Sequence, residues 1–344
     1  MAHPYERLTP ASLLTALEAG GIRGDGRLLQ LNSYENRVFQ VMLEDGSAVA
    51  AKFYRPARWS DEQILEEHAY ACLLAANELP VIAPQTLTIA VTPVGTAHTR
   101  VLGNPPTLAR RNDDGAATRW AVYPMRSGHG PELDNSAVLQ WLGRFVGRMH
   151  ATSGSDRFTS RRTLDPQTFG RDRLDALLQT DTVPAEQRDG YERLCDQALQ
   201  FVERAYSALP DLAVRRVHGD LHPGNILWRE AGPHIVDLDD CCNAPAVQDL
   251  WMLLSGEREA MRSQLARLLD GYAAFASFDL REIALIEPLR TLRMIHHSAW
   301  LAERWDDPAF PVGFPWFGTP NYWLQQQQQL REQIAAMEEP PLAL

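Results

Sequence analysis

The most informative segment of the sequence is His218-Gly219-Asp220-Leu221-His222-Pro223-Gly224-Asn225. Its pattern, H-x-D-x-x-x-x-N, has the spacing of the catalytic loop of kinases. Phosphoryl transfer needs a carboxylate that orients the attacking hydroxyl and accepts its proton, and a neutral oxygen ligand for magnesium. Asp220 and Asn225 carry side chains suited to these two roles. The segment therefore predicts a catalytic loop for phosphoryl transfer from ATP.

A second carboxylate, Asp237, follows Asn225 after two short apolar runs with Ala231-Gly232-Pro233 between them. A carboxylate at the end of such a strand can hold the magnesium that bridges the nucleotide phosphates, as the D-F-G aspartate does. Leu238 replaces the aromatic residue and the glycine is missing, so we do not expect a D-F-G conformational switch. Alone, the loop pattern is also compatible with ordinary turn residues. Together with Asp237 it favours catalysis, with Asp220 and Asp237 as the catalytic residues.

The amino-terminal half supplies a candidate nucleotide-binding strand. Strands are predicted over 37–43 and 48–54, joined by the turn Glu44-Asp45-Gly46-Ser47. Val49-Ala50-Ala51-Lys52 resembles the V-A-I-K strand of kinases, in which the lysine reaches the phosphates. Ala50 points to the same face and leaves room for an adenine ring. The alternative is a strand lysine that faces solvent, which the downstream loop makes the weaker interpretation.

A buried lysine needs an anion to hold it, and the next helix, predicted over 60–77, offers Glu66 and Glu67. Neighbouring helical positions differ by about 100°, so only one of the two can face the strand. The apolar stripe does not settle the choice. We favour Glu67 as the partner of Lys52.

The loop that covers the phosphates departs from the glycine-rich form. Leu31, Ser33 and Asn36 occupy the three glycine positions, which predicts a stiffer loop. Asn36 tolerates a left-handed backbone better than most residues. Ser33 is either a nucleotide contact or a turn residue, and the residues alone leave the two alternatives equal.

The remaining pattern predicts an α+β, protein-kinase-like fold with two lobes. Residues 1–125 would form a nucleotide-binding lobe with a small antiparallel sheet, which ends in a hinge strand over 120–124. Residues 126–344 would form a mostly helical catalytic and substrate lobe, with helices over 135–152, 194–209 and 283–305. Residues 103–117 are rich in proline, asparagine, aspartate and glycine and are predicted to be an exposed insertion.

Composition excludes several classes of protein. The net charge of −11 argues against nucleic acid and anionic membranes as partners, because both need a basic surface. No apolar stretch approaches the roughly 20 residues that cross a bilayer, and residues 1–10 do not resemble a signal peptide. The four cysteines show no disulfide-like spacing, which favours a reducing cytoplasm.

Three further features each allow two interpretations. Asp249 either caps the apolar helix that follows it or braces the catalytic loop through hydrogen bonds. His222 either touches substrate or stabilises the loop. Aromatic residues gather near the carboxy terminus, where they form either a cage for a quaternary ammonium group or hydrophobic packing: Trp300, Trp305, Trp316 and Trp323.

The sequence resembles the bacterial stress response kinase A family, within the superfamily of aminoglycoside phosphotransferases and choline kinases. The resemblance covers almost the whole chain and includes Lys52-Phe53-Tyr54-Arg55-Pro56, Ile64-Leu65-Glu66-Glu67-His68 and residues 31–38, 218–225 and 236–240. It implies a cytoplasmic, ATP- and Mg²⁺-dependent serine/threonine protein kinase in stress survival. It also implies Asp220 as proton acceptor, Asn225 and Asp237 as magnesium ligands, and Ser33 as an ATP contact.

The sequence is compatible with two classes of phosphate acceptor, small molecules and proteins. The segment 240–249 is short and shows no platform for a peptide, which favours a small acceptor of the aminoglycoside or choline type. The family resemblance favours serine and threonine of proteins, including the kinase itself. A catalytically inactive scaffold is disfavoured, because Lys52, Asp220, Asn225 and Asp237 are all present.

Overall fold

The computed structural model describes residues 5–6, 8–89, 99–113 and 116–344. The chain forms two compact units, each built from segments that are distant in sequence. The first unit combines Met1–His129 with Ile226–Asp239, and the second combines Gly130–Asn225 with Asp240–Leu344. The division into 1–125 and 126–344 describes lobes that are continuous in sequence, and it stays a prediction.

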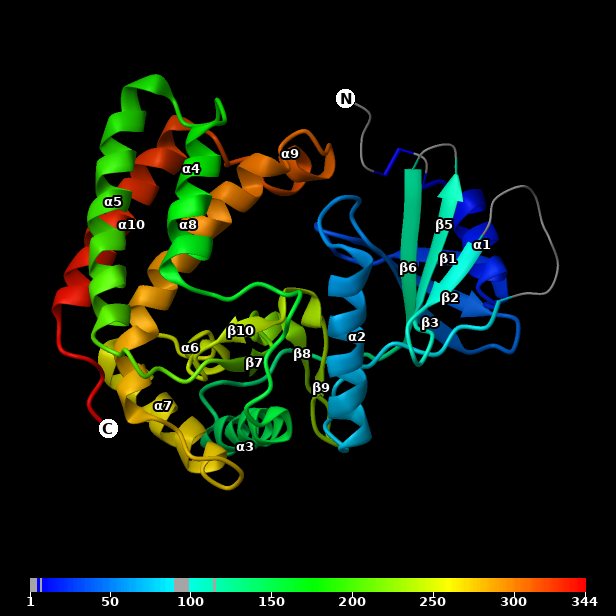
Figure 1. Ribbon diagram of the computed structural model, residues 1–344, viewed down its shortest axis with the longest axis horizontal. Coiled ribbons are helices and arrows are strands. Elements are labelled where there is room, and N and C mark those ends of the chain that lie inside the picture. The colour runs from blue at the N-terminus through cyan, green and yellow to red at the C-terminus, as the bar shows by residue number, and fades with distance from the viewer. Residues whose placement is uncertain (1–4, 7, 90–98, 114–115) are drawn as a thin grey trace. The chain divides into compact units, whose positions relative to one another are not determined.

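The first unit is built on a six-stranded antiparallel sheet with the order β1-β2-β3-β6-β5-β4 (Figure 1). The predicted hairpin is confirmed as β2 and β3, with Val38 opposite Lys52. The short strand predicted over 120–124 is the end of β6, which pairs with β3. The strands are β1 Gly24–Gln30, β2 Arg37–Leu43, β3 Ala48–Phe53, β4 Thr99–Leu102, β5 Leu108–Asp113 and β6 Ala116–Pro124.

The two faces of β3 pack into different hydrophobic cores. Val49, Ala51 and Phe53 belong to the core beneath α1 (Pro10–Ala19). Tyr54, which shares the face of Lys52, belongs to a second core with Ile64 of α2 (Asp61–Ala76). Period-two alternation therefore directs Lys52 away from α1 and to the side of the sheet that carries α2.

The prediction of an exposed insertion over 103–117 is wrong. Leu108 and Ala109 are fully buried, and β5 pairs with β6 with Ala109 opposite Trp120. The turn-forming residues at 103–106 lie before the strand, whereas Arg110, Arg111 and Asn112 give β5 a polar composition. Residues 114 and 115 lie outside the described residues.

The segment that carries Asp237 is a second, two-stranded hairpin of the first unit. It consists of β8 (Ile226–Leu227) and β9 (His234–Ile235), with the predicted turn between them. Ile235 N donates to Pro80 O at 2.8 Å, and Ile82 N donates to Ile235 O at 2.9 Å. These bonds attach the hairpin to the chain that follows α2, so Asp237 is placed by the first unit.

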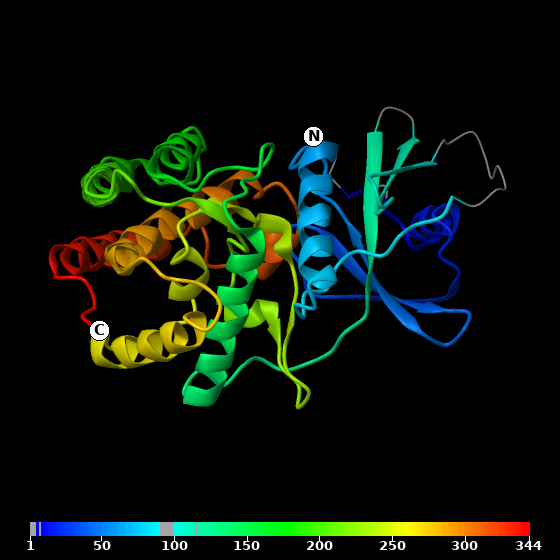
Figure 2. The same cartoon turned by 60° about the horizontal axis from the view of Figure 1, so that its bottom comes forward.

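The second unit is mostly helical, as predicted. Three long helices, α5, α8 and α10, pack side by side (Figure 2). The helices are α3 Ser136–Ser153, α4 Asp172–Leu178, α5 Ala185–Ser207, α6 Gln248–Trp251, α7 Arg258–Tyr272, α8 Ile286–Glu303, α9 Ala309–Gly313 and α10 Pro320–Glu338. A short sheet of β7 (Arg215–Val217) and β10 (Cys242–Ala244) leads into the predicted catalytic loop.

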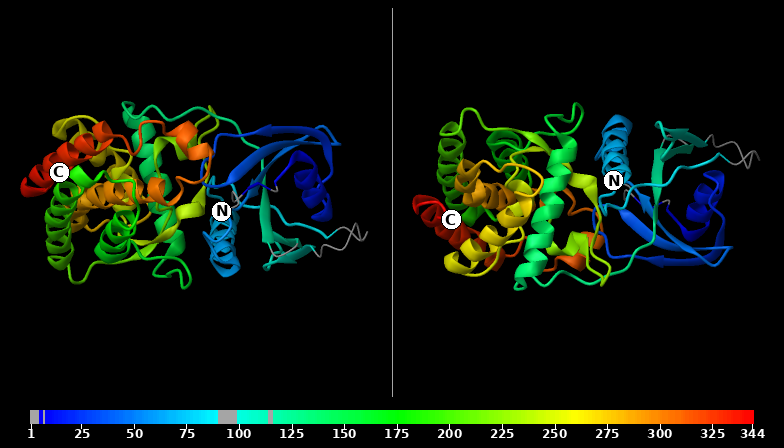
Figure 3. Two further views of the ribbon diagram at one scale, coloured as in Figure 1. Left: turned by 90° about the horizontal axis from the view of Figure 1, so that it is seen from above. Right: turned by 90° about the horizontal axis from the view of Figure 1, so that it is seen from below.

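Helix α3 packs closely on α7 (Figure 3). A Cβ atom at Gly143 would lie 1.9 Å from the backbone oxygen of Leu268, so only glycine allows this approach. Along the described residues, no helix is both long enough and apolar enough to span a membrane.

Candidate active site

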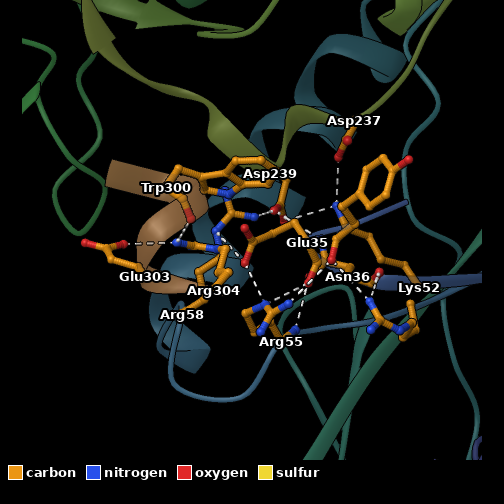
Figure 4. Close-up of polar contacts among 12 residues, drawn as sticks. Glu35, Asn36, Lys52, Arg55, Arg58, Asp237, Asp239, Trp300, Glu303 and Arg304 are labelled. Carbon is orange, nitrogen blue, oxygen red and sulfur yellow. Dashed lines mark hydrogen bonds and ion pairs between the residues drawn. The ribbon is translucent and has the colours of Figure 1, made fainter. Parts of the chain in front are cut away.

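Lys52 is the centre of a cluster of charged side chains in the first unit (Figure 4). Its Nζ lies 3.0 Å from Asp237 Oδ1 and 3.0 Å from Asp239 Oδ1. Burial alone lowers the pKa of Lys52, but the carboxylates of Asp237, Asp239 and Glu67 offset this effect and hold the pKa well above its usual value. Lys52 is therefore a buried, fully charged cation.

Asp237 is held in an unusual backbone conformation. Its φ of 63° lies in the left-handed region, which few residues other than glycine adopt. Its side chain is 52% exposed, whereas that of Asp239 is only 3% exposed. Strain of this kind is common at functional sites. The conformation leaves the Asp237 carboxylate open to a ligand while Lys52 still contacts it.

Asp239 is a structural hub that the sequence analysis did not identify. Its carboxylate contacts Lys52, forms an ion pair with Arg58 and accepts a hydrogen bond from Asn36 Nδ2 at 3.2 Å. The sequence feature that could have indicated Asp239 is its place as the second aspartate of Asp237-Leu238-Asp239. Arg58, 181 residues away in sequence, gave no comparable signal.

The loop 31–36 is fixed by side chains. Among the described non-glycine residues, positive φ occurs at Ala57, Glu78 and Asp237, so Asn36 does not adopt the left-handed backbone considered above. Asn36 is buried instead, and its Oδ1 accepts from Arg55 N at 3.1 Å. Ser33 lies partly buried in this loop, and its nucleotide contact stays a prediction.

Of the two candidate glutamates on α2, Glu67 is 2% exposed and Glu66 is partly exposed. The neighbouring His68 bonds through Nε2 to Tyr54 Oη at 2.7 Å, which fixes this side of α2 against the face of β3 that carries Lys52. Glu67 is among the charges that raise the pKa of Lys52. Its burial supports the choice of Glu67, while Lys52 forms its ion pairs with Asp237 and Asp239.

We expect Glu67→Gln to lower kcat/KM at least about tenfold, because a charge-assisted buried contact is worth about 1.5–3 kcal/mol. Glu66→Gln is the matched control and should change kcat/KM by no more than a partly exposed ion pair allows, about fivefold or less. Steady-state kinetics with varied ATP test the pair. A selective loss in Glu66→Gln would reverse the assignment.

The predicted catalytic loop, in the second unit, is braced by Asp249. This fully buried carboxylate accepts from His218 N at 2.8 Å and from Gly219 N at 2.9 Å, and it contacts His150 Nε2 at 3.1 Å. The bracing interpretation is confirmed, and the capping interpretation is wrong, because the residue before α6 is Val247.

Gly219 is required by the path of this loop. Its φ is 83°, and a Cβ atom would lie 2.3 Å from Asp240 O. The loop then returns on itself: Asn225 Nδ2 donates to Asp220 O at 2.9 Å, and His222 Nδ1 accepts from Gly224 N at 3.0 Å. These bonds favour the loop-stabilising role of His222.

Asp220 lies between two cationic or potentially cationic groups. Arg293 Nη1 is 2.5 Å from Asp220 Oδ1, and His222 Nε2 is 3.5 Å from Asp220 Oδ2. Burial alone would raise the pKa of Asp220. The hydrogen bond with His222 and the charge of Arg293 lower this pKa by more than burial raises it, so the net pKa is well below its usual value. Asp220 is therefore ionised near neutral pH.

The predicted magnesium ligands fit that ion chemically. Magnesium prefers oxygen ligands, and Asp237 offers an exposed carboxylate. Asn225 donates through Nδ2 to Asp220 O, so its amide oxygen points away from that carbonyl and remains able to accept a cation. Each of these two side chains therefore offers an oxygen of the kind the prediction requires.

The late aromatic residues pack mainly on one another. Trp305 and Phe317 have ring centroids 5.0 Å apart, and Tyr322 and Trp323 are 4.8 Å apart. Trp323 is fully buried. The packing interpretation therefore accounts for these rings.

Comparison with known proteins fits this geometry. Residues 27–286 match the family model of the phosphotransferase enzyme family. The chain is 40% identical to stress response kinase A of Escherichia coli (strain K12), over 100% of this chain and 98% of that protein. The chain belongs to the stress response kinase A family of phosphotransferases. Another relative, 38% identical over the same shares, is named serine/threonine protein kinase RdoA of Salmonella typhimurium (strain LT2).

Solved structures confirm the kinase-like fold of this family. An amicoumacin kinase in complex with AMP-PNP, Ca²⁺ and amicoumacin aligns with a TM-score of 0.69 at 20% identity, over 97% of this chain and 94% of that one. The choline kinase LicA of Streptococcus pneumoniae aligns with a TM-score of 0.58 at 13% identity, over 95% and 100%. At these identities the likeness shows the fold alone. The chain is a phosphotransferase with the predicted α+β, protein-kinase-like fold.

Proposed function

We propose that the protein is an ATP- and Mg²⁺-dependent kinase of the cytoplasm that phosphorylates serine and threonine hydroxyls of proteins, including its own, during stress. The observation that carries the catalytic part is Asp220, an ionised carboxylate in a loop braced by the buried Asp249. The full-length relatives named as stress response and serine/threonine kinases support the acceptor class. Nucleic acids and membranes are not expected as partners of a chain with a net charge of −11.

In the proposed reaction, the acceptor hydroxyl oxygen attacks the γ-phosphorus of ATP, and the bond from that phosphorus to the bridging oxygen of ADP breaks. Asp220 orients the hydroxyl and takes its proton. Lys52, held by Asp237 and Asp239, pairs with nucleotide phosphate, and Ser33 contacts ATP from the loop after β1. Asn225 and Asp237 would hold magnesium, which would supply positive charge to offset that of the phosphate oxygens.

A small-molecule acceptor is the second candidate. Several solved structures with this fold are of kinases named for small molecules, amicoumacin and choline among them. The short segment between Asp240 and Asp249 also leaves little chain for a peptide platform. These observations favour the alternative, whereas the more similar full-length relatives favour protein acceptors.

Phosphoamino-acid analysis decides between the two. The protein is incubated with γ-labelled ATP and Mg²⁺, alone and with a generic protein acceptor, alongside kinetics on aminoglycosides and choline. We expect phosphoserine and phosphothreonine in the wild type and their loss in Asp220→Asn. Efficient turnover of a small alcohol, without either phosphoamino acid, would overturn the protein-kinase proposal.

A further inference from the structure

Arg293 of α8 places a guanidinium group directly on the proposed base. The side chain is 44% exposed, and its Nη1 is 2.5 Å from Asp220 Oδ1. The loop alone would give the acceptor side of Asp220 a negative charge. Arg293 makes it neutral or positive, so this contact bears on which acceptors can approach.

Arg293 belongs to a basic cluster of the second unit, defined here as Arg162, Arg173, Arg293 and Arg304. The charges of these four side chains act on His296, which follows Arg293 by about one helical turn. Burial lowers the pKa of His296 well below its usual value, and all four arginines lower it further. Burial and Arg293 likewise lower the pKa of His297 to about 4. Both imidazoles are therefore neutral, and the positive charge of this region is carried by arginine.

The geometry of the cluster is fixed by packing. The imidazole of His296 stacks on Phe169, with ring centroids 4.9 Å apart. Phe169 lies in a π-helix, Gln167–Arg171. Such helices are rare in proteins as a whole, but where they occur they are often at functional sites. This stack ties α8 to the segment that leads to Arg173.

One carboxylate is shared by two arginines of the basic cluster. Glu303 pairs with both Arg173 at 2.8 Å and Arg304 at 3.0 Å, so one anion serves two guanidinium groups. The buried Nε of Arg173 makes no hydrogen bond within the described residues. The four arginine charges that act on His296 belong to a chain whose net charge is −11.

We propose that the acceptor carries an anionic group beside its hydroxyl, and that Arg293 is a specificity-determining residue that selects it. Resting on the proposed function, this means serine or threonine flanked by aspartate or glutamate. The planar guanidinium binds a carboxylate through two parallel hydrogen bonds. An acceptor carboxylate that engages Arg293 releases Asp220, which can then bind the acceptor hydroxyl. A cationic acceptor would instead meet like charge, which costs binding energy.

The test uses three serine peptides of equal length in which the flanking residues are acidic, neutral or basic. Wild-type protein should show kcat/KM at least about tenfold higher for the acidic than for the neutral peptide, mainly through KM, since a charge-assisted hydrogen bond is worth about 1.5–3 kcal/mol. Arg293→Gln should reduce this ratio to about one, and Arg293→Glu should favour the basic peptide. Arg262→Gln, on α7 and 45% exposed, is the matched control and should keep the wild-type ratio.

A pH profile separates specificity from loss of structure. Because Arg293 lowers the pKa of Asp220 in the free enzyme, its removal should shift the acidic limb of kcat/KM to higher pH, which a general loss of fold would not do. Arg293→Lys keeps the charge and should keep part of the preference for the acidic peptide.

The inference fails, and the protein-kinase function stands, if the wild type prefers neutral or basic peptides or if Arg293→Gln keeps the wild-type ratio. Absence of phosphoserine and phosphothreonine, with turnover of a small alcohol, overturns both.

Discussion

Asp220→Asn is expected to lower kcat by about 10²- to 10⁴-fold, the usual contribution of general acid–base catalysis, while the affinity for ATP stays nearly unchanged. Asparagine keeps the shape of the side chain but cannot accept the proton of the acceptor hydroxyl. Nucleotide phosphates are assigned to other residues, so the loss belongs to the chemical step. Single-turnover kinetics, with ATP affinity from calorimetry, measure the two effects separately.

The matched control is Asp156→Asn, because Asp156 lies in the same unit and its side chain is 71% exposed. It should retain wild-type turnover. Thermal unfolding of both variants checks that the fold persists. Near-normal kcat in Asp220→Asn would remove this residue from the mechanism.

The same residue makes a prediction about pH. An ordinary aspartate has a pKa near 3.9. Because His222 and Arg293 hold the pKa of Asp220 below that value, the base stays ionised throughout the weakly acidic range. Protonation of Asp220 should not lower kcat/KM between pH 5 and pH 7, and a fall of kcat/KM in that range must come from another group.

Local sequence patterns were sufficient to predict much of the fold and of the candidate site. The hairpin of β2 and β3 was predictable because alternation and a turn signal lie within a few residues of each other. The helix predicted over 135–152 was equally local, because its apolar residues recur at helical spacing, and in α3 they are all buried: Val138, Leu142, Phe145, Val146 and Met149. The loop containing Asp220 was recognisable because its chemistry fixes the spacing of an acid and an amide.

Pairings between distant segments were not predictable in the same way. The contact between Lys52 and Asp237 joins residues 185 positions apart, and that between Asp220 and Arg293 joins residues 73 apart. No spacing rule connects such positions. Strand β5 was missed for a related reason, because its polar sequence becomes a strand only through pairing with β4 and β6. Tertiary context therefore decided what propensity could not.

Asp237 and Asp239 share Lys52, and this allows metal binding to be separated from placement of the lysine. In Asp237→Asn, Asp239 still holds Lys52, and asparagine tolerates the positive φ at this position. The fold and the lysine should therefore persist while one charged magnesium ligand is lost. Asp239→Asn should behave differently, because it leaves the buried Lys52 and Arg58 without a shared carboxylate, a change that typically costs about 3–5 kcal/mol of stability.

We therefore expect Asp237→Asn to abolish most of the magnesium dependence of ATP binding, with an affinity loss of at least about tenfold in the presence of Mg²⁺ and little loss without it. Asn225→Ala should weaken the Mg²⁺-dependent affinity less, because a neutral amide contributes no charge. Asp239→Asn should lower affinity with and without Mg²⁺ and reduce the melting temperature. Calorimetric titrations with ATP, each with Mg²⁺ and with a chelator, distinguish these outcomes. If Asp237→Asn retains the full magnesium enhancement, Asp237 holds Lys52 but does not bind the metal.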